Sequence, residues 1–72
     1  MIQVGYTKTD GSVVVEETVQ GAPNANTALA NLKEEKASDD SVVKVWLAMQ
    51  RFTDENGDLV DAYWDIYAEI DM

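Results

Sequence analysis

The sequence predicts an α+β fold of order ββαββ, a two-layer domain in which a four-stranded, mainly antiparallel sheet of two hairpins carries one helix on one face. Apolar and polar residues alternate in two pairs of segments, which is typical of half-buried strands. Asp10-Gly11 and Asn56-Gly57 separate the members of each pair and favour tight hairpin turns. A run of helix-forming residues lies between the pairs. With 72 residues, the chain is expected to form a single domain, residues 1–72.

The first hairpin is expected over residues 2–19, with Asp10-Gly11 as a two-residue turn of type I′. This turn would set Val4 opposite Glu17 and so bring a carboxylate onto the apolar face. Either Glu17 lies at an unburied end of the sheet, or a bulge after Val15 turns it away.

A helix is expected from about Ala25 to Ala37, after a break at Gly21-Ala22-Pro23. Asn24 or Asn26 could cap it by accepting a backbone N–H of the first turn. Its apolar stripe is light in side-chain volume, so the helix can cover a sheet but cannot form a core alone. The stripe consists of Ala25, Ala28, Leu29 and Leu32.

The second hairpin is expected over residues 42–72. A type I′ turn at Asn56-Gly57 would set Leu47 opposite Ile66 and Met49 opposite Trp64, and one face of the hairpin would then be apolar on both strands. That inward face comprises Val43, Val45, Leu47, Met49, Trp64, Ile66 and Ile70. A one-residue slip would bury Asp61, Asp65 and Glu69 without partners. The core is expected to combine the inward face with Ile2, Val4, Tyr6, Val13, Val15, Leu29 and Leu32.

The composition argues against several classes of function. The chain has no histidine and no cysteine, so the usual zinc sites and the Ser-His and Cys-His nucleophiles have no candidates, and we expect neither an enzyme nor a bound cofactor or metal. Fourteen acidic and five basic residues give a net charge of −9, which opposes direct binding to nucleic acid or to anionic membranes. We expect a cytoplasmic protein.

Two acidic groups resemble catalytic or metal sites only superficially. Residues 54–58 contain oxygen ligands and a glycine, but they lack the ligand spacing of a calcium loop and its bidentate Glu, so a polar turn explains them. Glu69 and Asp71 would lie about 6.7 Å apart on one strand face, within the range of glycosidase carboxylates, but an open sheet face offers no pocket to raise a pKa.

The outward face of the second hairpin is the candidate site, because it combines aromatic residues with acids. Seven acids and no base follow Arg51. We therefore expect a non-enzymatic binding protein that engages a basic protein surface, in its narrowest form an inhibitor that imitates nucleic acid. The predicted partner-binding residues are Trp46, Phe52, Asp61, Tyr63, Asp65, Tyr67, Glu69 and Asp71.

Charge density limits the idea of imitation. The acids of the last strand would lie about 9 Å apart, whereas duplex DNA carries one charge per about 1.7 Å. The alternative is a homo-oligomeric interaction module, for instance a homodimer, that uses the aromatic face and whose acidity serves only solubility. The small size, acidity and ββαββ order of the chain suit a phage-type accessory protein, but no motif supports that assignment.

Overall fold

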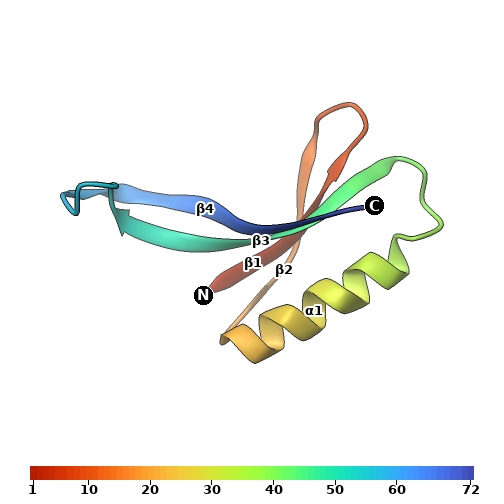
Figure 1. Cartoon of the computed structure of the whole chain (residues 1–72), viewed down its shortest axis with the longest axis horizontal. Coiled ribbons are helices and arrows are strands. Elements are labelled where there is room, and N and C mark those ends of the chain that lie inside the picture. Colours follow the sequence, from red (N-terminus) through yellow and green to blue (C-terminus); the bar gives the residue numbers. More distant parts are fainter.

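The computed structural model describes residues 1–72 and contains the four antiparallel strands and the single helix that the sequence predicts (Figure 1). The sheet order is β2-β1-β3-β4, so β1 and β3 join the two hairpins. The helix α1 lies across one face of the sheet (Figure 1). We call the opposite, uncovered side the open face. The elements are β1 (Ile2–Lys8), β2 (Val13–Val19), α1 (Ala22–Glu35), β3 (Val42–Thr53) and β4 (Leu59–Asp71).

The helix begins three residues before the expected start. Pro23 lies in its first turn, where a missing backbone N–H costs no hydrogen bond, and the first helical bond runs from the Ala25 N–H to the Gly21 carbonyl. No side chain caps this end: the Asn24 amide instead donates to the Gln20 carbonyl. Proline therefore marks the beginning of this helix and not a break before it. No helix in the structure has the length and apolar character needed to cross a membrane.

The core lies between α1 and the two central strands. The small side chain of Ala25 is fully buried there, so the helix can approach the sheet closely. The Lys36 ammonium lies 4.8 Å from the centre of the Tyr6 ring and borders the core near the C-terminal end of α1. The buried cluster comprises Ile2, Val4, Ala25, Leu29, Leu32, Val42, Val45 and Leu47.

Both hairpin turns are one residue longer than expected. The Asp54 N–H donates to the Asp58 carbonyl, and the Gly57 N–H donates to the Asp54 carbonyl. Gly57 and Gly11 have positive φ angles of 84° and 87°, and no non-glycine residue has a positive φ. Each turn is thus a type I turn followed by a left-handed glycine, and the prediction of type I′ turns is wrong. The Asp54 carboxylate stabilises this form, because it accepts the N–H groups of Asn56 and Asp58.

The predicted register of the second hairpin is also wrong. Near the core Leu47 pairs with Ala68 instead of the expected Ile66. This shift of two residues leaves each side chain on its expected face, because side chains alternate with a period of two. Tyr67 is then an extra residue, so that Ala48 pairs with Ile66 and Gln50 with Trp64. Because side chains alternate between faces, this single extra residue moves Ile66 and Trp64 to the open face.

Five residues predicted to lie in the core are therefore exposed. Ile66 and Trp64 lie on the open face, as do Val13 and Val15 of the edge strand β2, and no second layer covers that face. Val43 has no partner on β1, because Thr7 pairs with Lys44 and Lys8 pairs with Val42. Val42 is therefore buried in the core in place of Val43. The sequence pattern identified apolar residues correctly, but bulges decided which of them face the helix.

In the first hairpin Val4 pairs with Glu17, as predicted. Glu16 is an extra residue between Glu17 and Val15, so a bulge does follow Val15. It does not turn Glu17 away from the face of Val4. The Glu17 side chain is exposed because β2 is an edge strand and α1 packs mainly against β1 and β3.

The second hairpin extends well beyond the rest of the sheet (Figure 1). β1 pairs with β3 only over residues 42–49, so residues 50–64 form a two-stranded projection, which we call the arm. It contributes to the elongated shape of the molecule, 42 × 28 × 16 Å. Neither face of the arm is covered by another element. A shift of register in the arm therefore buries no acid and carries no desolvation cost.

Candidate functional site

The structure divides the predicted partner-binding residues between two faces. Strand pairing places Trp46, Glu69 and Asp71 on the open face, because the partners of one pair point to the same side. Tyr63 and Asp65 pair with Arg51 and Met49 and lie on the opposite side. Phe52 and Asp61 are exposed on the arm, and Tyr67 occupies the bulge. The expected continuous aromatic and acidic face is therefore not formed.

Trp46 lies on the expected face but is buried, with only 2% of its surface exposed. It pairs with Gly5 of β1, and its indole ring covers this glycine so closely that a Cβ at Gly5 would collide with the ring and with the Val14 carbonyl oxygen. The indole N–H is buried and has no hydrogen-bond partner. The expectation that Trp46 is an exposed contact residue is wrong, because its exposure depends on a neighbouring strand that the sequence did not identify.

Two of the predicted acids form ion pairs. Lys44 Nζ lies 3.0 Å from Glu69 Oε2, and Arg51 Nε lies 3.0 Å from Asp65 Oδ2. The hydrogen bond that Lys44 donates to Glu69, together with the negative charge of Glu69, raises the pKa of Lys44. Both pairs are solvent-exposed, so each contributes little to stability. They nevertheless compensate the charges of two acids of the predicted site.

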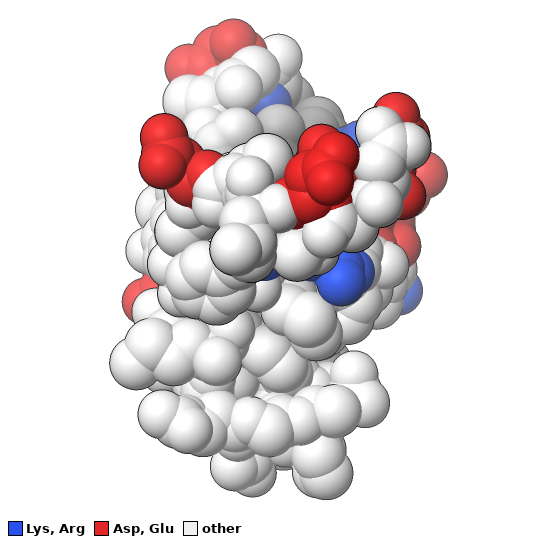
Figure 2. Space-filling view, turned by 90° about the vertical axis from the view of Figure 1, so that its left-hand side faces the viewer, with Lys and Arg blue, Asp and Glu red and all other residues white.

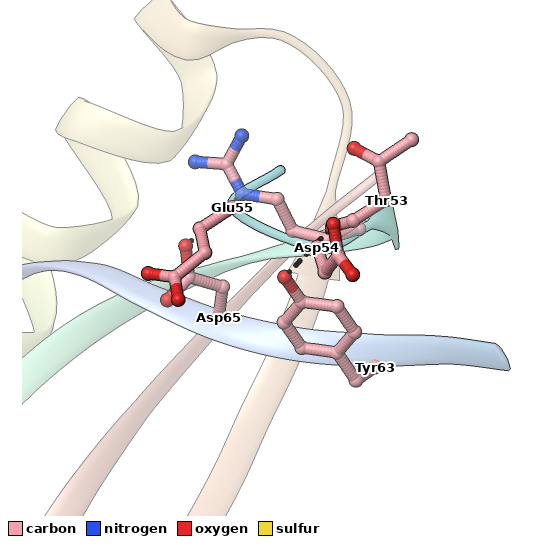
Figure 3. Close-up of a pocket in the computed structure, with 6 residues that line it drawn as sticks. Thr53, Asp54, Glu55, Tyr63 and Asp65 are labelled. Carbon is pink, nitrogen blue, oxygen red and sulfur yellow. Dashed lines mark hydrogen bonds and ion pairs between the residues drawn. The ribbon is translucent and has the colours of Figure 1, made fainter. Parts of the chain in front are cut away.

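The far part of the arm surrounds a shallow hollow of about 270 Å³, on the side that faces away from the open face. The Tyr63 hydroxyl crosses the ribbon and donates to the Thr53 carbonyl at 3.0 Å, which ties the two strands together (Figure 3). Three carboxylates and one guanidinium make the hollow polar. The lining residues are Arg51, Thr53, Asp54, Glu55, Tyr63 and Asp65.

Several polar groups of the hollow are already hydrogen-bonded to one another or to the backbone of the arm. No group of three or more His, Cys, Asp or Glu side chains is positioned to hold a metal ion. Asp54 Oδ1 already accepts two backbone N–H groups of its own turn. The hollow is open to solvent, so it offers no buried environment around its acids.

Other acids have structural roles in loops. Asp10 Oδ1 accepts the Ser12 hydroxyl at 2.6 Å and the Ser12 N–H at 2.9 Å, and Asp39 makes the same two bonds with Ser41. These hydrogen bonds lower the pKa of both aspartates. A bond from the Thr9 N–H to the Ser41 carbonyl connects the two loops. Sequence analysis did not single out this repeated Asp-x-Ser pattern, although it is visible in the sequence.

The acidic charge is unevenly distributed. Figure 2 looks onto the end of the molecule that carries the arm: acidic side chains lie in its upper part, and the lower part of this face shows no charge. The sequence has the same asymmetry, because residues 18–32 contain no charged side chain. At the end of the arm Asp54, Glu55, Asp58 and Asp61 lie within eight consecutive residues that contain no base.

Comparison with known proteins adds no further information about this site. No protein-family model matches the chain, and no curated protein and no solved structure is significantly similar to it.

Proposed function

We propose that this protein is a non-enzymatic binding module whose arm engages a basic surface on another protein. The observation that supports this is the arm itself, which extends beyond the sheet and carries at its end four acids that form no ion pair. A projecting ribbon can enter a concave surface that a flat sheet cannot reach. Its negative field would accelerate association with a positively charged partner and would make that association sensitive to salt.

Exposed apolar groups accompany the charges. Leu59 is 86% exposed and Phe52 is 56% exposed, both on the arm and close to the acidic turn. Apolar anchors surrounded by charged groups are typical of protein-binding surfaces, whereas charge that serves solubility alone needs no such anchors.

A basic protein surface is favoured over imitation of nucleic acid. Glu69 and Asp65 are compensated by Lys44 and Arg51, so Asp58, Asp61 and Asp71 are the acids of the hairpin's returning strand that remain without an ion pair. Asp61 and Asp71 are ten residues apart, or about 33 Å along a strand, far from the spacing of about 1.7 Å in duplex DNA. The density of acidic charge that remains without ion pairs suits contact with a few lysines or arginines on a partner protein.

Affinity capture from lysate at low and high salt tests this proposal, if wild-type protein is compared with two triple variants of equal charge change. The arm variant carries Glu55→Gln, Asp58→Asn and Asp61→Asn, and leaves Asp54 to hold the turn. The control carries Glu34→Gln, Glu35→Gln and Asp40→Asn, far from the arm. We expect a basic protein that wild type and control retain at low salt and that the arm variant loses. Equal retention by both variants would contradict the proposal.

A further inference from the structure

We propose that the open face of the sheet is an interface between two copies of this chain, packed sheet against sheet with the helices outside. This inference does not rest on the function of the arm. It concerns a different surface, and a failure of one proposal leaves the other standing.

The open face carries apolar side chains on both hairpins. Strand pairing places Val13 and Val15 of β2 there, and Ile66 and Trp64 of β4. Each of these four residues is between 40% and 58% exposed. Buried Trp46 and Ala48 lie between the two groups on the same face. Exposed apolar groups gathered on one face of a monomer usually mark an interaction site.

Little net charge remains on the open face. Two molecules of net charge −9 would repel one another through most of their surfaces. On the open face, however, Lys44 compensates Glu69, so Asp71 is the one acid that strand pairing places there without an ion pair. The uncharged residues Gln3, Thr7, Thr18 and Gln50 complete the face by their strand pairings. Glu16, in the bulge of the edge strand, is at its margin.

The dimensions of the molecule leave room for a standard interface on this face. The molecule measures 42 × 28 Å across its two longer axes, so the open face offers at most about 1,200 Å², against the about 800 Å² per partner of a standard interface. Only 11 of the 72 residues are buried in the single chain. A second sheet at the usual spacing of about 10 Å would cover the exposed apolar groups and provide the missing layer.

Pairing of two β4 edges is the less favourable way to associate. That arrangement would bring two copies of one acidic strand side by side, and like charges opposite each other destabilise a sheet. The acids concerned are Asp61, Asp65, Glu69 and Asp71.

Sedimentation of the purified protein from micromolar to millimolar concentration tests the interface. We expect a wild-type dimer, and we expect Ile66→Lys to weaken its association by about tenfold or more, because it places a charge among the apolar groups of the contact. Leu59→Lys is the matched control, since it makes the same kind of change on the arm, away from the open face. It should leave the dimer intact.

Circular dichroism establishes that each variant is folded, and Val15→Lys, on the same face but on another strand, replaces Ile66→Lys if that variant unfolds. A wild-type protein that remains monomeric at millimolar concentration would overturn the proposal. So would a dimer that tolerates both open-face substitutions, or one that Leu59→Lys dissociates.

Discussion

Gly5 lies directly opposite Trp46 on the neighbouring strand, and the indole ring rests on the glycine backbone. This contact joins the two hairpins on the face that the helix does not cover. It also removes the largest aromatic side chain of the predicted site from solvent, so it links the stability of the sheet to the character of its open face.

Gly5→Ala should destabilise the protein by about 1–3 kcal/mol, because the new methyl group would meet both the indole ring and the Val14 carbonyl oxygen. Denaturant unfolding followed by circular dichroism measures the effect. Thr7→Ala, on the same strand and face, is the control and should cost much less. An unchanged midpoint for Gly5→Ala would show that the indole does not rest on the glycine.

Gly57→Ala should destabilise the protein by about 1 kcal/mol for a different reason: φ is +84° at this residue, and nothing lies near the added methyl group. The cost is backbone strain without crowding. Gly57→Asn should therefore recover part of the stability, because asparagine tolerates positive φ. Equal denaturation midpoints for the alanine and asparagine variants would argue against strain as the cause.

Stability should decrease in acid through Asp10 and Asp39. Hydrogen bonds from Ser12 and Ser41 lower the pKa of these carboxyls below the ordinary value of 3.8. Because the pKa of each carboxyl is lower in the folded state than in the unfolded state, ionisation stabilises the fold at every pH above the unfolded-state pKa. This stabilisation is lost as the pH falls through the folded-state pKa. Ser12→Ala and Ser41→Ala should therefore destabilise the protein at neutral pH, with an effect that shrinks below about pH 3.8.

Carboxyl titration by NMR measures the two pKa values directly. The pKa of Asp10 should rise in Ser12→Ala and stay unchanged in Ser41→Ala, so each variant is the control for the other. Unchanged pKa values in both variants would contradict the assigned cause.

Glu69→Gln should return the pKa of Lys44 toward its ordinary value of 10.5, since Glu69 is the main cause of the increase. Because the pKa of Lys44 is higher in the folded state than in the unfolded state, the charged lysine stabilises the fold fully at a pH below the unfolded-state pKa. The stabilisation is lost as the pH rises through the folded-state pKa, and therefore only above about pH 10.5. NMR titration of the lysine side chain is the measurement. Asp65→Asn, which removes the partner of Arg51, should leave Lys44 unaffected, and an equal change in both variants would refute the pairing.

Local sequence patterns were sufficient to predict the order of elements and six of the buried core residues. Alternation and the helical stripe identified these residues because both patterns depend on the geometry of single elements. They are Ile2, Val4, Leu29, Leu32, Val45 and Leu47. The helix start was misplaced because proline can equally end a segment or begin a helix.

The candidate site was harder to predict than the fold, because the face of a residue depends on every residue between it and the turn. Extra residues at Glu16, Val43 and Tyr67, and the longer turns, each change this count. A single error exchanges the two faces, as it did for Trp64 and Asp65.

The sequence by itself determined the ββαββ order, the positions of the turns and the excess of acid, since these follow from residue types and short-range patterns. Only the tertiary structure decided that β1 lies beside β3, which buries Trp46 over Gly5 and leaves the arm uncovered. The reason is physical: exposure is set by the elements that cover a side chain, and contacts between strands distant in sequence are not encoded in the period of either strand.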